Sequence, residues 1–372
     1  MPYMGMQAAT MTIPLWPAEG TRVRMARASR RANQGVNIQA VAERAGVSAM
    51  TVSNVVSGRR KVRETTREAV LAAVQELGYT PNVAAQALAS AGNIRLGLLC
   101  STTESAFLSS ILVGVLDATT ALGAQVLLRR VPVDRSDEIL DEIERLAASG
   151  VSAILIAPPY CEAISRSGFV STTQVPLMAM SPGDALPNMP SVGIDDFAAA
   201  RDMTRFLIGL GHRRVGFIRA SETHIISHTR QAGYRAALEE AGLSWNRDLA
   251  AYGDLTFESG LVAAEHLLGL AERPTAIFAS NDDMAAAVVS LAHRRGIRVP
   301  EDLSVAGFDD SPIAVKIWPP LTTMRQPVAR IAARAATLVL QGLRTANADT
   351  TLPQAEYLPY ELIERESTAR LP

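Results

Sequence analysis

The chain has 372 residues, of which 48% are hydrophobic and 20% are charged. This length suggests two or three compact units, and this composition excludes a disordered polymer because it can bury a sizeable core. No apolar run has the length of a transmembrane helix, so no membrane association is expected. The residues around Pro14 and Pro17 lack the apolar core of a secretion signal, which predicts a cytoplasmic protein.

Cysteine and histidine patterns argue against disulfide and metal chemistry. Cys100 and Cys161 are the only two cysteines, and their apolar neighbours predict small core residues in a reducing compartment. The five histidines show no metal-site spacing with these cysteines. No serine-nucleophile elbow, phosphate-binding loop or metalloprotease motif occurs either. We therefore expect no enzyme activity, no metal and no cofactor.

Charge is distributed unevenly along the chain. Between residues 21 and 95 there are 12 basic and 4 acidic residues, whereas the remainder holds 24 basic and 33 acidic ones. Residues 1–35 are predicted to be a basic, disordered tail, because no apolar period supports a fold there. A small basic region on an acidic body is typical of a domain that binds a polyanion. A charged surface that is merely solvated would give the same excess of basic residues.

Residues 36–81 have the pattern of a helix–turn–helix domain. Asn37 can cap a helix that Gly46 breaks, and Ser48 can cap a second helix that ends near residue 56. A third helix is expected over residues 64–77. In such a domain the second helix enters the major groove of DNA, with its N-terminal residues at the base edges.

From residue 94 onward, short apolar runs alternate with amphipathic helical stretches. This alternation is typical of parallel α/β sheets that are covered on both faces. The expected strands lie at residues 96–100, 125–128, 153–156, 177–180, 215–218, 276–279 and 305–308. Seven or more strand–helix units are too many for a single sheet of ordinary size. Residues 94–372 are therefore predicted to form a body of two doubly wound lobes.

From about residue 36 to residue 365 the chain resembles the lactose/galactose repressor (LacI/GalR) family. In the head the resemblance rests on Val41–Ala42–Glu43–Arg44–Ala45–Gly46–Val47–Ser48, Thr51–Val52–Ser53 and Leu77–Gly78–Tyr79–Thr80–Pro81–Asn82. In the body it rests on Gly211–His212, Asn281–Asp282–Asp283–Met284–Ala285, Val305–Ala306–Gly307–Phe308–Asp309–Asp310 and Pro320–Leu321–Thr322–Thr323. The resemblance implies an all-α head and an α/β periplasmic-binding-protein-like body. It also implies a transcriptional regulator, expected to be a repressor, whose operator affinity is set by a small effector, expected to be a sugar or sugar derivative.

The resemblance places DNA contacts on the head and on a hinge helix and linker at residues 82–93. The full expected set is Ser48, Ala49, Met50, Thr51, Ser53, Asn54, Thr66, Tyr79, Asn82, Ala85 and Leu88. Ala49, Met50 and Asn54 stand where the family reads bases. Family members often have Arg at the position of Asn54, which either pairs with adenine or contacts only phosphate. Leu88 would be an apolar wedge in the minor groove.

Polar residues that follow strands form the expected effector site. Asn281 and Asp309 come after apolar strands, and Arg230 is expected to open a helix; open α/β sheets bind ligands at these carboxyl ends. A carboxylate, an amide and a guanidinium suit a polyhydroxylated ligand, although each could instead cap a loop or pair on the surface. By resemblance the set is Phe107, Tyr160, His224, Arg230, Leu255, Asn281, Asp309 and Gln326.

A homodimer is expected, because two operator half-sites require two heads. By resemblance Leu116 lies toward the partner, and burial within its own domain is the alternative. No heptad pattern that could join two dimers follows the strand expected at Tyr360–Glu361–Leu362–Ile363. The main alternative function is a solute-binding protein of a transport system, whose body would look alike but which would lack the basic head.

Overall fold

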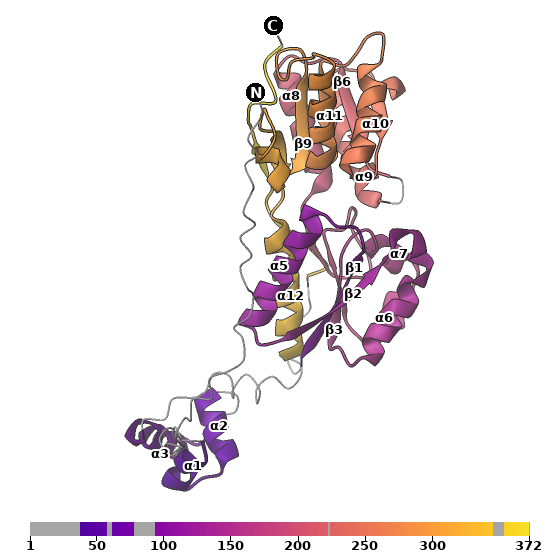
Figure 1. Ribbon diagram of the computed structural model, residues 1–372. Coiled ribbons are helices and arrows are strands. Elements are labelled where there is room, and N and C mark those ends of the chain that lie inside the picture. Colours follow the sequence, from indigo (N-terminus) through magenta and orange to yellow (C-terminus); the bar gives the residue numbers. More distant parts are fainter. Residues whose placement is uncertain (1–37, 58–61, 78–93, 222–223, 345–352, 372) are drawn as a thin grey trace, which may run out of the picture. The chain divides into compact units, whose positions relative to one another are not determined.

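The computed structural model describes residues 38–57, 62–77, 94–221, 224–344 and 353–371. The described residues form two separate compact units, a helical head and a larger body (Figure 1). The expected tail at residues 1–35 and hinge helix at residues 82–93 lie outside the described residues.

The described part of the head consists of the helices α1 (Ile38–Ala45), α2 (Ala49–Ser57) and α3 (Glu64–Glu76). Each helix contributes one valine without exposed surface to a common core, namely Val41, Val52 and Val70. Gly46 ends α1 with φ of +65°, a left-handed conformation that glycine adopts without steric cost. The helix–turn–helix prediction is confirmed.

The first lobe of the body is a parallel sheet whose described strands run in the order β11-β5-β4-β3-β1-β2. Their bounds are β1 (Arg95–Ser101), β2 (Gln125–Val131), β3 (Ala153–Ile156), β4 (Leu177–Met180), β5 (Ser191–Gly193) and β11 (Ala355–Tyr357). Its helices are α5 (Ala106–Ala121), α6 (Ile139–Ala148), α7 (Cys161–Arg166) and α12 (Val328–Arg344). Because alternate residues of a strand point to opposite faces, Leu98 joins the core under α5 and α12, whereas Leu99 joins the core under α6.

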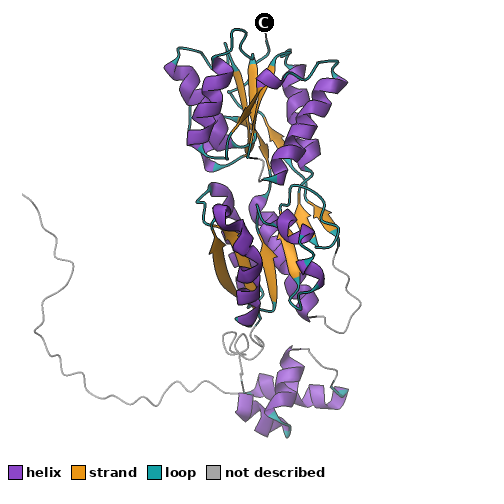
Figure 2. Cartoon of the chain, turned by 90° about the vertical axis from the view of Figure 1, so that its right-hand side faces the viewer, coloured by secondary structure: helices purple, strands orange, loops and turns teal. Residues whose placement is uncertain are grey.

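The second lobe repeats this plan with described strands in the order β12-β10-β9-β8-β6-β7. Their bounds are β6 (Val215–Arg219), β7 (Ala250–Tyr252), β8 (Ala276–Ala279), β9 (Ser304–Asp309), β10 (Thr322–Arg325) and β12 (Glu361–Ile363), and β12 runs antiparallel to β10. The helices are α8 (Asp196–Gly209), α9 (Ile225–Glu240), α10 (Phe257–Leu268) and α11 (Asp282–Arg294). Figure 2 shows the sheet of each lobe between layers of helices, which confirms the prediction of two doubly wound lobes.

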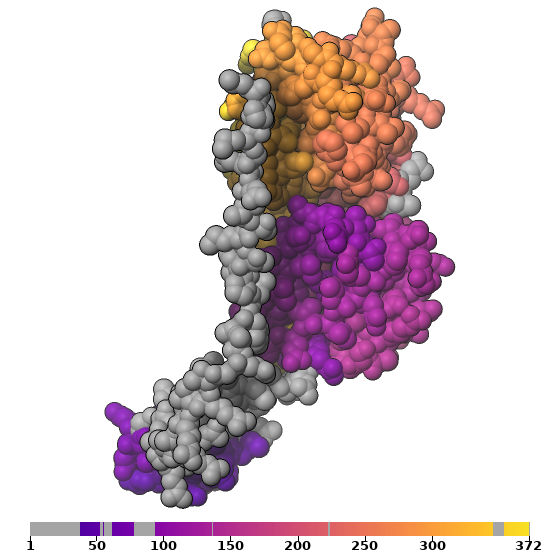
Figure 3. Space-filling model, viewed as in Figure 1, coloured from indigo at the N-terminus to yellow at the C-terminus, as the bar shows by residue number. Residues whose placement is uncertain are grey.

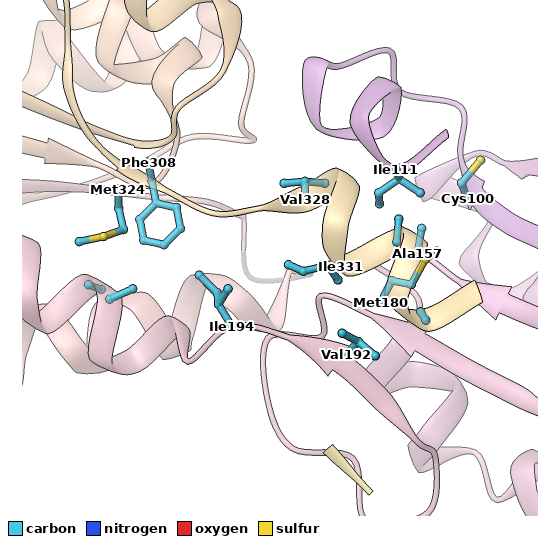
Figure 4. Close-up of a cluster of buried hydrophobic side chains, with 14 of the residues drawn as sticks. Cys100, Ile111, Ala157, Met180, Val192, Ile194, Phe308, Met324, Val328 and Ile331 are labelled. Carbon is cyan, nitrogen blue, oxygen red and sulfur yellow. The ribbon is translucent and has the colours of Figure 1, made fainter. Parts of the chain in front are cut away.

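Within the described residues, the chain passes between the lobes after β5, after β10 and after β11. Residues near 100–180 and residues near 210–310 consequently form separate parts of the body surface (Figure 3). One continuous hydrophobic cluster accompanies these crossings. Figure 4 shows Phe308 and Met324 of the second lobe beside the crossing, and Val328 and Ile331 at the start of α12 near Ile111 of the first lobe.

All seven expected strands are present, and β3, β4 and β8 have the predicted bounds. The strands β5, β7, β10 and β11 were not predicted. β5, β7 and β11 have three residues each, and β10 contains a single apolar residue, so none of them presents an apolar run that predicts a strand. Four short 3-10 helices, at Val133–Glu138, Phe169–Ser171, Arg247–Leu249 and Pro312–Val315, complete the described elements.

Candidate functional site

The start of α2 presents the candidate nucleic-acid surface of the head. Met50 is 70% exposed, and Ala49 is partly buried against the core of the head. Ser53 and Asn54 lie on α2, but their side chains are outside the description, and Thr66 is half-buried on α3. The expected DNA-binding residues Tyr79, Asn82, Ala85 and Leu88 lie outside the described residues.

Ser48 begins α2 as a helix cap. Its Oγ accepts a hydrogen bond from the backbone N–H of Thr51 at 3.2 Å, and it lies 2.9 Å from Thr51 Oγ1. These two bonds hold Ser48 against the first turn of α2. The structure therefore supports a positioning role for Ser48 and Thr51, and their contact with phosphate stays a prediction.

Arg230 is a buried cation at the carboxyl edge of the second sheet. It lies in the second turn of α9, so the prediction that it opens the helix was wrong. Only 3% of the residue is exposed, its Nε donates to Asp196 Oδ1 at 2.8 Å, and its Nη1 donates to the backbone oxygen of Ser280. The guanidinium carbon lies 3.5 Å from the centre of the Phe308 ring. Burial raises the pKa of Asp196, and the charge of Arg230 opposes this rise.

Asp309 and Gln326 form a second polar pair at the same edge. Asp309 ends β9 with φ of +111°, a conformation that side chains other than glycine rarely adopt. Gln326 Nε2 donates to Asp309 Oδ1 at 2.5 Å, while the buried Oε1 of Gln326 has no hydrogen-bond partner among the described residues. Desolvation raises the pKa of Asp309 to about 6, against the opposing charge of Arg230. A carboxylate and an unsatisfied amide oxygen therefore lie together.

Asn281 connects two of the expected effector positions. Its Oδ1 caps α11 by accepting from Met284 N at 3.0 Å, and its Nδ2 donates to the backbone oxygen of Leu255 at 2.8 Å. Leu255 has φ of +71°, so this bond holds a loop that is strained for a residue with a side chain. The structure thus brings Asn281 and Leu255 together, as it does Asp309 and Gln326.

Asp282 is a buried carboxyl that was not among the expected site residues. Its Oδ1 accepts from Thr323 Oγ1 and its Oδ2 accepts from Ser311 N, both at 2.6 Å. Desolvation, reinforced by the neighbouring charge of Asp309, raises its pKa to about 8. An acidic residue three positions after the end of a buried strand was the available signal. For Asp196, the partner of Arg230, no comparable signal was available, because the two residues are 34 positions apart.

Among the described residues, no hydrogen bond joins Phe107 or Tyr160 to the polar residues Arg230, Asn281, Asp309 and Gln326. His224 directly precedes α9, and desolvation lowers its pKa while the charge of Asp254 opposes this. Phe107 is half-buried in the first turn of α5. Tyr160 is only 1% exposed, and its hydroxyl donates to the backbone oxygen of Val131 at 2.5 Å. Tyr160 is thus a core residue here, and its role toward an effector stays a prediction.

A hollow of about 460 Å³ lies at the carboxyl ends of β6 and β7. Its lining is Ser221, Tyr252, Gly253, Asp254, Ser259 and Val262. None of the eight expected effector residues lines it, although Asp254 directly precedes Leu255. The hollow is therefore adjacent to the polar residues Arg230, Asn281, Asp309 and Gln326 but is a distinct site.

Two groups of large apolar side chains are exposed on the body. The first lobe presents Val113 and Leu116, 53% and 51% exposed, on α5, and Leu127 and Leu128 on the neighbouring strand β2. The second lobe presents Val315 and Trp318 in the segment between β9 and β10. Exposed apolar groups of this kind mark candidate interaction surfaces.

The helix–turn–helix head and the two-lobed body, with buried polar groups at the carboxyl ends of its strands, define a class: DNA-binding regulators that respond to a ligand. The comparisons agree with this class. The family model described as bacterial regulatory proteins of the lacI family matches residues 37–82, and the periplasmic binding protein-like domain matches residues 204–368. The chain belongs to the lacI family of bacterial regulatory proteins.

Relatives extend the similarity to nearly the whole chain. Catabolite control protein A of Priestia megaterium is 32% identical over 90% of this chain and 99% of its own. The transcriptional regulator CelR of Thermobifida fusca is 32% identical over 89% of this chain and 97% of its own. The solved lac repressor dimer bound to operator and the anti-inducer ONPF is 28% identical, covers 90% of this chain and 100% of its own, and has a TM-score of 0.69.

These relatives are transcriptional regulators and not enzymes. This chain is accordingly a DNA-binding transcriptional regulator with an effector-binding body. Among the helices that the structure describes, none combines the length and the apolar character needed to cross a membrane.

Proposed function

We propose that the chain is a dimeric transcriptional repressor whose operator affinity is set by a neutral, polyhydroxylated effector of the sugar type. The assignment of this effector class rests on the pairing of Asp309 with Gln326. The buried Oε1 of Gln326 accepts no hydrogen bond within the described residues, and it lies beside a carboxylate that is ionised at neutral pH. Buried acceptors are stabilised by donors, and the hydroxyl groups of a sugar are donors.

Arg230 supplies the complementary donor. Its Nε and Nη1 are used by Asp196 and Ser280, and no hydrogen bond of Nη2 is found among the described residues. Because Asp196 already balances the guanidinium charge, the remaining N–H groups are donors without a net positive charge. This arrangement suits a hydroxyl more than a phosphate. A solved structure of CelR in complex with cellobiose, 30% identical with a TM-score of 0.63, supports a sugar-type effector. Phe107, Tyr160, His224, Leu255 and Asn281 complete the proposed site.

For DNA, we propose that the start of α2 reads base edges through Ala49, Met50 and Asn54. The exposed side chain of Met50 at the first turn of α2 supports this assignment, because base contacts in this motif come from the N-terminal residues of the second helix. The remaining expected residues, Ser48, Thr51, Ser53, Thr66, Tyr79, Asn82, Ala85 and Leu88, would contact the backbone or the minor groove. A protein that binds chromosomal operators acts in the cytoplasm, and we propose that location.

For the dimer, we propose that the exposed apolar residues of α5 and β2 face a second copy. Val113 and Leu116 are three residues apart on one helix, so their side chains share one face. Leu128 on the adjacent strand extends this apolar surface, because it points to the same face of the sheet as Val126, which packs with the core under α5. The lac repressor dimer on its operator, similar over 90% of this chain, supports pairing of two copies.

Two assays test the proposal together. Operator duplexes are selected from random DNA with the full-length protein, and their affinity is measured from 50 to 200 mM salt; specific binding that weakens with salt is expected because phosphate contacts release counterions. Thermal stability is then measured with cellobiose, maltose, D-ribose and D-ribose 5-phosphate, since a ligand of the folded state raises its stability. Stabilisation by the phosphate ester alone would contradict the proposed effector class, and failure to enrich any sequence would contradict the proposed regulator.

A further inference from the structure

The loop that follows β4 makes a direct contact with α9 of the other lobe. Gly183 lies in this loop, and Thr229 lies in the second turn of α9. Thr229 Oγ1 donates a hydrogen bond to the backbone oxygen of Gly183 at 2.6 Å. Because β4 belongs to the first sheet and α9 packs on the second, this bond joins the two lobes outside the covalent crossings.

Gly183 permits this contact because it has no side chain. A Cβ at this position would lie 2.2 Å from the backbone nitrogen of Ile226 and 2.5 Å from its Cα. These are backbone atoms in the first turn of α9, so they cannot rotate aside as the end of a flexible side chain could. The backbone of Gly183 is not in the left-handed region. The requirement for glycine therefore comes from the close approach of the lobes.

A buried carboxylate anchors the same loop within the first lobe. Glu162, in the first turn of α7, is 6% exposed, and its Oε1 accepts a hydrogen bond from Gly183 N at 2.6 Å. The peptide groups of Gly183 are thus held from both sides, the N–H by the first lobe and the carbonyl by the second. A rotation of one lobe against the other must break the bond from Thr229, because Glu162 keeps the loop with its own lobe.

We propose that Gly183 and Thr229 form a latch that stabilises the present arrangement of the two lobes and thereby regulates the effector site. Thr229 directly precedes Arg230 on α9, so a rotation of the lobes that releases the latch also moves the guanidinium of Arg230 relative to the first lobe. An interaction made in only one of two arrangements shifts the equilibrium toward that arrangement by its full differential free energy. The regulatory half of this inference rests on the proposed function, whereas the latch itself does not.

Hydrogen–deuterium exchange of the full-length protein without DNA or effector tests the latch. Thr229→Val keeps the shape of the side chain and removes the donor, and Thr229→Ser keeps the hydroxyl as the matched control. A net hydrogen bond of ordinary strength predicts roughly two- to tenfold faster exchange for Thr229→Val in peptides covering residues 181–186 and 225–232. Peptides from β3 and β8 should be unchanged, and Thr229→Ser should resemble the wild type. Equal exchange of the wild type and Thr229→Val in both peptides would overturn the latch.

Gly183→Ala provides an independent test, because the added methyl group cannot fit against Ile226 while the lobes keep this arrangement. Its matched control is Gly209→Ala at the end of α8, where an added Cβ meets nothing within 4 Å. Gly183→Ala should accelerate exchange in the same two peptides more than Thr229→Val does, and Gly209→Ala should not. Similar exchange for both alanine variants would count against the close approach.

The proposed regulatory role of the latch is tested by measuring affinity for an operator duplex that was selected by the wild-type protein. Thr229→Val should change the operator affinity of the effector-free protein about two- to tenfold, and Thr229→Ser should not. If exchange changes but operator affinity does not, the latch exists and its regulatory role is refuted. If the wild type selects no duplex, the proposed function fails, while the exchange result still decides the latch.

Discussion

Replacement of Arg230 by alanine should lower the free energy of unfolding by about 3–5 kcal/mol, the usual effect of removing one member of a buried ion pair. The reason lies in Asp196, which is as deeply buried as Arg230 and would keep a carboxylate without its partner 2.8 Å away. Loss of the guanidinium from the Phe308 ring adds to this effect. Arg230→Ala should therefore be destabilised as well as unresponsive to effector.

The two effects separate in the double variant Arg230→Met with Asp196→Leu. Apolar residues of similar volume in place of a buried ion pair are often neutral or stabilising, so most of the lost stability should return while the effector response stays absent. Urea unfolding gives the free energies, and thermal shift with the active sugar of the tested set gives the response. The deficit of Arg230→Ala should also shrink as the pH falls, because burial raises the pKa of Asp196 and the charge of Arg230 no longer opposes this rise. This reasoning would be refuted if Arg230→Ala were as stable as the wild type. It would also be refuted if the Arg230→Met, Asp196→Leu double variant still responded to the sugar.

Three further predictions follow from particular residues. Asn54→Ala should relax operator preference at one base pair per half-site by ~1–3 kcal/mol if Asn54 pairs with a base; a uniform loss over all selected duplexes would show a phosphate contact instead. Leu116→Glu should weaken dimerisation and, with it, operator binding, and an unchanged dimer in sedimentation equilibrium would contradict the proposed interface. Asp282 has a pKa of about 8 in the folded protein, so its contribution to stability is present below about pH 4 and lost as the pH rises toward 8. Asp282→Asn should therefore flatten the pH dependence of urea unfolding between these values, and parallel curves would argue against a protonated Asp282.

The sequence by itself determined the elements whose signals are local. The strands β3, β4 and β8 are short apolar runs between helical patterns, and their bounds were predicted correctly. Ser48 was predicted to cap α2, and the cap is present. Asn281 and Asp309 were expected at the edge of the second lobe because they follow apolar strands in motifs that resemble the family, although their hydrogen bonds with Leu255 and Gln326 were not predicted. Such features depend on residues close in sequence or on a motif, and both can be recognised without coordinates.

The tertiary structure alone decided which distant residues meet. Asp196 neutralises Arg230 because α8 and α9 pack side by side. Thr229 reaches Gly183 because two lobes approach so closely that a methyl group would not fit. Tyr160 became a core residue because β2 placed the carbonyl of Val131 within reach of its hydroxyl. Each contact joins residues between 29 and 46 positions apart. No periodicity or spacing encodes such a contact, because it arises only when complete elements pack against one another and bury their surfaces.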